Sequence, residues 1–503
     1  MKLSAEASAG DALWALPASA IAGLIARREI SAREVCEVVL ARIEALDPVL
    51  HAFATTTPDL ALNAAGAVDR ALAARAPLGP LAGVPFSVKD LILTDGVRTA
   101  MGSPLYRDFV PTQDDIAVDR MKAAGALMIG KTVTSEFGYT ASGRNPLGPA
   151  VLNPWNDAVT PGGSSAGAAV AVATGMAPVA LGSDGGGSIR IPASCCGVVG
   201  FKPSMGRVPL YPGCRNERLP GSSSFESVEH IGPLSRTVAD AVLMFDAIAG
   251  PDPRDRHSRP REVSSWHELI RGDVRSLRIA YSPNWGYAAI DHRVRGLLDT
   301  AVLAFSEDLG CTVEEAAPDF ADPGPHLPAL EALETDLSGL RDLARGRHNE
   351  LSPALVAVIE RDWIAEEFTN AITMRKALCN RMAAFMETFD LIITPTLAVP
   401  PFAASIDDPE EIDGREVKPG DWAPFPIIAN LTGQPAISLP AGLTSDGLPV
   451  GLQIIGRHLD DATVLRAASA FEAVRPWRHL WPDARGRHAA PSRSGEILAG
   501  APS

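Results

Sequence analysis

Short apolar segments alternate with amphipathic helices in this chain, and this alternation constrains the fold more than any other feature. A capping box at Ser31 opens a helix whose apolar residues keep helical spacing until Pro48, where we expect the helix to end. Residues 83–89 and 126–131 are strand-length apolar segments, and an amphipathic helix over residues 115–124 separates them. The order strand, helix, strand predicts an α/β fold.

The most apolar stretch covers residues 166–181 and consists largely of alanine and glycine. It is too short for a membrane span and it contains Pro178, so we expect a helix that is buried on all sides. The first residues of the sequence contain no apolar run of signal-peptide length. These observations predict a protein without a membrane partner.

The chain has 503 residues, 46% of them hydrophobic, which suffices for a large core. We find no linker clear enough to divide it, and therefore expect a single domain over residues 1–480. Residues 481–503 are polar and aperiodic, which predicts a disordered tail.

Charge and cysteine usage narrow the class of protein further. The formal net charge is −15, which argues against a nucleic-acid partner because such partners require a basic face. The six cysteines form no CxxC or Cys/His cluster with metal-ligand spacing, so no metal site is expected. Reduced, buried thiols are typical of a cytoplasmic protein, and the role of the adjacent pair Cys195-Cys196 stays open.

The segment "GSDGGGSIRIP" (182–192) places three glycines directly before Ser188. Glycine loses much conformational entropy on ordering, so such a run requires a physical reason. Neither the P-loop pattern nor the dinucleotide pattern GxGxxG is met, and Pro192 disfavours a helix directly after Ser188. A phosphate-binding loop is therefore disfavoured.

Residues 163–167 match GxSxG, which would make Ser165 the nucleophile of an α/β-hydrolase esterase. That motif must follow a buried strand, whereas the preceding "NPWNDAVTP" is polar and contains two prolines. The required histidine would also have to come from His230 or beyond, because none lies between His51 and His230. This alternative is weaker but remains open.

The segments "PGGSSAG" (161–167) and "GSDGGGS" (182–188) flank one small-residue helix, so both loops are expected to meet at one end of a sheet. A catalytic hydroxyl needs a base and an oxyanion hole. We expect consecutive backbone N–H groups to form that hole, with the glycines leaving room for the substrate carbonyl. The groups concerned are those of Gly185, Gly186, Gly187 and Ser188.

A lysine is the expected base, because a desolvated lysine can lose its proton near neutral pH and an arginine cannot. Lys89 and Lys131 both end apolar strands, and Lys202 lies in "GFKPS". The spacing of these residues does not distinguish among the three.

Seven segments taken together resemble the amidase signature family, in the order typical of that family and over roughly residues 30–475. They are "LAGVPFSVKD", "TPGGSSAG", "GSDGGGSIRIPASCCGVVGFKPS", "GPLSRTVAD" with "AGPDPRD", "DLIITPT", "NLTGQPAISLPAG" and "LPVGLQIIG". The resemblance implies a large mixed, twisted β-sheet covered by helices on both faces. It also implies a catalytic core at about residues 60–245 and a substrate-covering, C-terminal part at about 246–480.

The resemblance implies a Ser-cisSer-Lys triad. Ser188 is then the nucleophile, Ser164 the bridging serine after a cis peptide bond, and Lys89 the base. A second set of residues is expected to support the site structurally, namely Ser165, Asp184 and Arg190. Two departures are the alanine in "SSAG" and Gly185, where many family members carry a larger apolar residue.

The implied function is hydrolysis of a small-molecule carboxamide to an acid and an amine or ammonia, through an acyl-enzyme on Ser188 and without a cofactor. Carbamates, cyclic amides and aryl amides remain alternative substrates, and a homodimer remains open. A glutaminase subunit of a tRNA-dependent amidotransferase is less favoured, because Ile191 stands where glutamine is typical and no tyrosine follows Tyr287. A non-enzymatic binding protein is disfavoured because no triad residue is missing.

Overall fold

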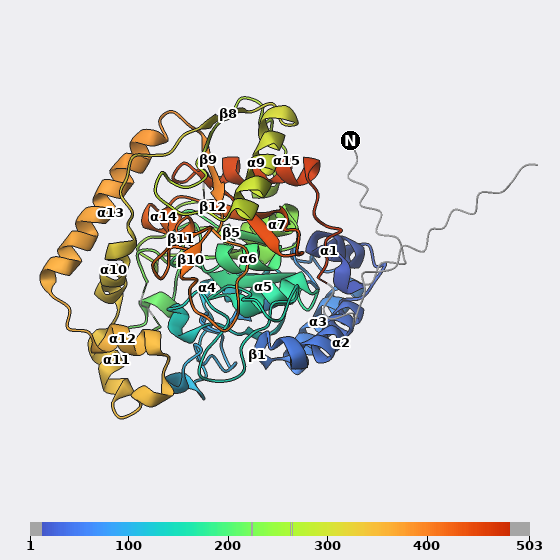
Figure 1. The fold of residues 1–503 in the computed structure, drawn as a ribbon. Coiled ribbons are helices and arrows are strands. Elements are labelled where there is room, and N and C mark those ends of the chain that lie inside the picture. Colours follow the sequence, from blue (N-terminus) through green and yellow to red (C-terminus); the bar gives the residue numbers. More distant parts are fainter. Residues whose placement is uncertain (1–12, 223–224, 262, 264, 483–503) are drawn as a thin grey trace, which may run out of the picture.

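The computed structural model describes residues 13–222, 225–261, 263 and 265–482 (Figure 1). Its centre is one mixed sheet of eleven strands in the order β1-β3-β2-β4-β6-β5-β12-β13-β9-β7-β8. The strands are β1 (Phe53–Thr56), β2 (Pro85–Lys89), β3 (Leu127–Thr132), β4 (Val179–Ser183), β5 (Val199–Lys202), β6 (Ile231–Ser235), β7 (Arg278–Tyr281), β8 (Thr312–Glu315), β9 (Leu391–Pro395), β12 (Ala436–Leu443) and β13 (Pro449–Gly456). The hairpin β10 (Glu411–Ile412) and β11 (Arg415–Glu416) stands apart from this sheet.

Fifteen α-helices lie within the described residues, and Figure 1 places α1–α3 at one end of the molecule and α10–α13 at the opposite end. The helices are α1 (Ala18–Ala26), α2 (Ala32–Leu50), α3 (Pro58–Ala73), α4 (Ile116–Ala123), α5 (Ala166–Ala173), α6 (Arg190–Cys196), α7 (Val238–Ile248), α8 (Trp266–Leu269), α9 (His292–Glu307), α10 (Leu327–Glu334), α11 (Leu337–Ala344), α12 (Pro353–Glu360), α13 (Ala365–Phe385), α14 (Pro426–Leu431) and α15 (Asp461–Val474).

Helices cover both faces of the sheet, because successive residues of a strand point to opposite sides. Ile393 of β9 and Ile454 of β13 pack in the core that includes α9 and α15. Their neighbours Ile392 and Ile455 pack in the core that includes α13 and α14. The predicted α/β class and the mixed sheet between two helical layers are therefore confirmed.

Helix α5 is buried on all sides, as its composition predicts. Each of its eight residues is buried, and the Cβ that an alanine at Gly167 would add overlaps the Ala52 carbonyl oxygen. Helix α5 can therefore pack this closely against its neighbours only because its side chains are small.

Two helix boundaries differ from the sequence prediction, both at a proline. Helix α2 continues through Pro48 to Leu50 and ends at His51 in the left-handed conformation. Helix α6 begins at Arg190 and contains Pro192 in its first turn. A proline near a helix start removes no intrahelical hydrogen bond, and one in the last turn removes a single bond, so neither stops the helix.

The predicted division of residues 1–480 into a catalytic core and a covering part stays a prediction. Most of the predicted tail lies outside the described residues. No helix among those described is long and apolar enough to cross a membrane.

Candidate active site

Two parallel strands place Lys89 and Ser183 side by side. Strands β2 and β4 pair in parallel with Val88 opposite Leu181, so both strands end at the same edge of the sheet. Lys89 is the last residue of β2, and Ser183 is the last residue of β4. This is the edge at which parallel strands commonly present functional groups.

The Lys89 amine is buried and contacts two serines. Its Nζ lies 2.7 Å from Ser164 Oγ, 2.9 Å from Ser183 Oγ and 3.1 Å from the Ser183 carbonyl oxygen. The side chain is 1% exposed, which leaves water little access to the charged form. Burial accordingly lowers the pKa of Lys89 to about 8, although Glu229 and Asp184 act in the opposite direction.

Ser164 reaches Lys89 from the loop that precedes α5. The Gly163–Ser164 peptide bond is cis, as the resemblance implied. Ser165 follows, with its N–H donating to the Ser188 carbonyl at 3.1 Å and its hydroxyl to the Ser183 carbonyl at 3.2 Å. Ser165 therefore ties the two serine-glycine loops together, and its hydroxyl is fully buried.

The three triad candidates lie at the wall of one cavity of about 960 Å³. Lys89, Ser164 and Ser188 all line it, whereas Ser165 does not, which weighs against Ser165 as a nucleophile. The volume suits a drug-sized ligand. The apolar part of its wall is formed by Leu91, Phe137, Tyr139, Phe225, Val228, Leu327, Leu330, Trp422, Ile427 and Leu431.

The three glycines of the run differ in their surroundings. Gly187 has φ 118°, a conformation that favours glycine. Its N–H donates to Asp184 Oδ1 at 2.6 Å, so it is not free to bind an oxyanion. The prediction that Gly187 belongs to the oxyanion hole is therefore wrong. Gly185, Gly186 and Ser188 line the cavity. Within the part of the chain that the structure describes, the N–H groups of these three residues have no protein acceptor.

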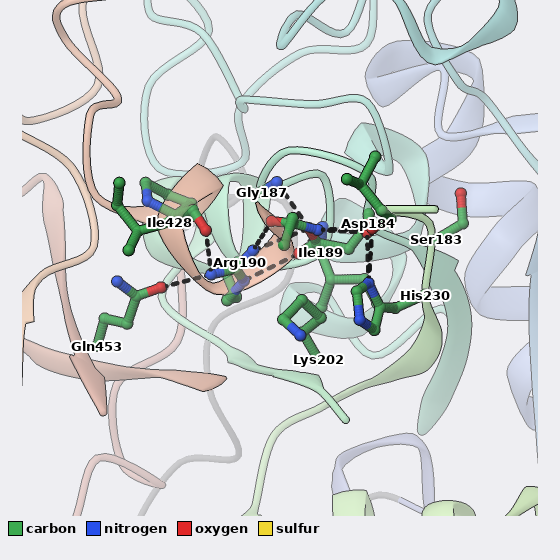
Figure 2. A network of polar contacts seen from close by, with 12 residues as sticks. Ser183, Asp184, Gly187, Ile189, Arg190, Lys202, His230, Ile428 and Gln453 are labelled. Carbon is green, nitrogen blue, oxygen red and sulfur yellow. Dashed lines mark hydrogen bonds and ion pairs between the residues drawn. The ribbon is translucent and has the colours of Figure 1, made fainter. Parts of the chain in front are cut away.

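Asp184 and Arg190 form a buried ion pair at 2.9 Å with both side chains 0% exposed (Figure 2). Arg190 also donates to the Pro426 carbonyl and to Gln453 Oε1, both at 2.7 Å. Burial alone would raise the pKa of Asp184, but the Arg190 charge and its hydrogen bonds hold it below its ordinary value. The pair thus fixes the loop that carries the glycines and Ser188.

The other two candidate lysines are held by backbone carbonyls away from the serines. Lys131 Nζ donates to the Ile92 carbonyl and to the hydroxyls of Thr94 and Thr99. Lys202 Nζ donates to the carbonyls of Pro203 at 3.0 Å and Gln434 at 2.6 Å. Among the three lysines considered, Lys89 is the one that contacts a serine hydroxyl.

Two residues of the site were missed at the sequence level, Ser183 and Glu229. Glu229 lines the same cavity as Ser183 and Lys89, and it is 8% exposed. The sequence signal for Ser183 is its place just before Asp184 at a strand end. Glu229 has no local signal, because it reaches the site only through the pairing of β6 with β4.

Comparisons with known proteins identify the family of this chain. The chain matches the family model described as Amidase over residues 34–465. It is 38% identical over 480 residues to an acylamidase from Rhodococcus erythropolis, covering 93% of this chain and 97% of the relative. It is 37% identical over 497 residues to a glutamyl-tRNA(Gln) amidotransferase subunit from Moorella thermoacetica, covering 94% and 99%.

A solved structure is also similar, that of a bacterial aryl acylamidase of the amidase signature enzymes. It matches with a TM-score of 0.85 at 30% identity and covers 92% of this chain and 96% of that one. Fold, site and comparisons define an amidohydrolase that acts on C–N bonds. The chain belongs to the amidase signature family, so the family resemblance is confirmed.

Proposed function

We propose that the chain hydrolyses a small-molecule amide by nucleophilic attack of Ser188, with Ser164 as the bridging hydroxyl and Lys89 as the base. The observation that carries this proposal is the 2.7 Å contact of the buried Lys89 amine with Ser164 Oγ, at the wall of the cavity that Ser188 also lines. A neutral amine in this position accepts a proton from Ser164, which accepts one from Ser188.

The reaction then follows from these groups and water alone. Ser188 Oγ bonds to the amide carbonyl carbon, and the oxygen gains negative charge near the free N–H groups of Gly185, Gly186 and Ser188. The relay returns the proton to the leaving nitrogen as the C–N bond breaks. Water then attacks the acyl-enzyme by the same relay and releases the acid.

The cavity favours neutral, apolar substrates over anionic ones. Among the described residues that line it, Lys418 is the one ammonium outside the triad. Six carboxyl groups line the wall in addition to Glu229. These are Asp322, Glu331, Glu334, Asp407, Asp408 and Asp421. The apolar wall suits an aryl or alkyl group, so aryl amides, aliphatic amides and carbamates are the substrates we propose.

A glutaminase subunit is the second candidate, favoured by the similarity to the Moorella protein. Free glutamine carries a carboxylate, which the acidic wall disfavours, and Ile191 departs from the pattern typical of that subunit. We therefore rank amide hydrolysis by the free-standing chain first.

A hydrolysis screen tests this proposal. Purified protein is assayed against neutral aryl amides, aliphatic amides, cyclic amides and carbamates, each paired with an analogue that carries a carboxylate, and against glutamine. We expect hydrolysis of neutral members, weaker hydrolysis of their anionic partners, and none by Ser188→Ala. Activity of Ser188→Ala at the wild-type level would refute the proposed nucleophile, and a preference for glutamine would favour the second candidate.

A further inference from the structure

The loop that carries Gly185 continues the antiparallel pairing of β4 with β6. Ser183 lies opposite Ile231, and Asp184 and His230 exchange backbone hydrogen bonds at 2.8 and 3.2 Å. The next pair along this register is Gly185 with Glu229. The register thus brings the Glu229 side chain to the face that Ser183 occupies.

Gly185 gives this carboxyl group its space. A Cβ at position 185 would lie 2.7 Å from Glu229 Oε2, which is closer than such atoms approach in proteins. Any larger residue there displaces the carboxyl group. Gly185 has no positive φ, so room for Glu229, rather than backbone conformation, is the reason for glycine.

Ser183 connects Glu229 to the base. Its hydroxyl lies 2.9 Å from Lys89 Nζ, and Ser183 lines the same cavity as Glu229. A neutral amine has two N–H groups and one lone pair. The two Ser183 oxygens can accept both N–H groups, which leaves the lone pair for the Ser164 hydroxyl.

We propose that Glu229 is a positioning residue of the catalytic base, acting through Ser183 and accommodated by Gly185. An ionised carboxylate only accepts hydrogen bonds, so the Ser183 hydroxyl donates to Glu229 and its oxygen is left to accept from Lys89. This fixed direction turns the Lys89 lone pair toward Ser164. The inference rests on the proposed function, in which Lys89 is the base.

Electrostatics also links Glu229 to the Lys89 amine. Burial raises the pKa of Glu229 to about 7 and lowers the pKa of Lys89 to about 8, while the charge of each group favours the ionised form of the other. The other titratable groups facing the pair are Asp184, which Arg190 holds, and Cys214, whose pKa burial raises. Asp115 lines the small cavity behind Ser183, and burial raises its pKa to about 8.

The test measures how fast a fluorophosphonate reagent labels Ser188 as a function of pH, which requires no knowledge of the substrate. The Ser188 oxygen bonds to phosphorus, fluoride leaves, and the proton passes to Ser164 and Lys89. We expect the labelling rate to rise with pH as Lys89 loses its proton and then to reach a plateau. The Glu229 charge raises the pKa of Lys89. Glu229→Gln should therefore move the rising limb of this profile to lower pH, by about 1 to 3 pH units, and lower its plateau.

Two further variants separate this role from a merely structural one. Gly185→Ala displaces the carboxyl group while keeping it, and should move the limb in the same direction even if Glu229→Gln fails to fold. In the double variant the two shifts should not add, because both remove the same contact. The control is Glu472→Gln, since Glu472 is also 8% exposed but lies on α15, and it should leave the limb in place.

The outcomes distinguish this inference from the proposed function. A wild-type protein that is not labelled at Ser188 refutes the proposed function itself. Labelling of Ser188 with a limb that stays in place in both Glu229→Gln and Gly185→Ala overturns the role of Glu229 alone. Additive shifts in the double variant would contradict the shared contact.

Discussion

In the proposed mechanism, Lys89 sets the pH range in which this site can act. A lysine in water has a pKa of about 10.4 and is protonated at neutral pH. Burial brings the pKa of Lys89 to about 8, so a usable fraction of the amine is neutral near pH 7 and the fraction grows with pH. We expect the acylation rate to rise with pH and to level off above about pH 8, as a pH–rate profile would measure.

Substitution of Lys89 tests whether the amine works as a base or only as a charge. Lys89→Ala should flatten the rising limb and lower the rate by at least ~10²-fold, within the range of losing general-base assistance. Lys89→Arg should be about as damaging, because arginine keeps its proton. Near-wild-type activity of Lys89→Arg in the same profile would show that a positive charge suffices.

The sequence predicts some residues of the site and not others, for physical reasons. Ser164, Ser188 and Lys89 lie in recognisable motifs, and the structure brings all three to one cavity. Asp90, next to Lys89, turns away as strand alternation predicts, and its carboxyl group accepts from the Ala100 N–H at 3.1 Å. Glu229 was missed because a sequence without strand register does not reveal which residue lies opposite Gly185.

Helix α5 shows how one element supports the site. It begins directly after Ser165 and is packed on every side by other parts of the fold. Its one glycine and its five alanines could be read from the sequence, and so could its burial. The ends of α2 and α6 could not, because whether a proline stops a helix depends on the turn in which it falls.

Two glycine substitutions test the packing of these elements. Gly167→Ala should destabilise the protein by about 1–3 kcal/mol, since its Cβ would overlap backbone atoms of Ala52 and Val133. Gly296→Ala on the exposed side of α9 has no atom within 4 Å of its Cβ, and should stabilise by about 0.5–1 kcal/mol. Melting temperatures of the two variants should shift in opposite directions, and equal shifts would contradict the packing argument.

The whole molecule joins distant parts of the chain around one cavity. The triad candidates come from β2 and from the loops flanking α5 and β4, whereas the facing wall comes from α10, α12, α14 and the segment around Lys418. The wall is acidic, as is the chain, whose net charge is −15. The identity of the substrate is not readable from sequence motifs, because most of the wall residues lie outside them.

The central claim is that Ser188 carries the covalent intermediate, and the most direct measurement is the position of the adduct. The protein is treated with a fluorophosphonate, digested, and analysed by mass spectrometry. We predict a single modified serine, Ser188, with labelling abolished in Ser188→Ala and slowed in Lys89→Ala. An adduct on Ser165 would contradict the account and return the site to a GxSxG nucleophile.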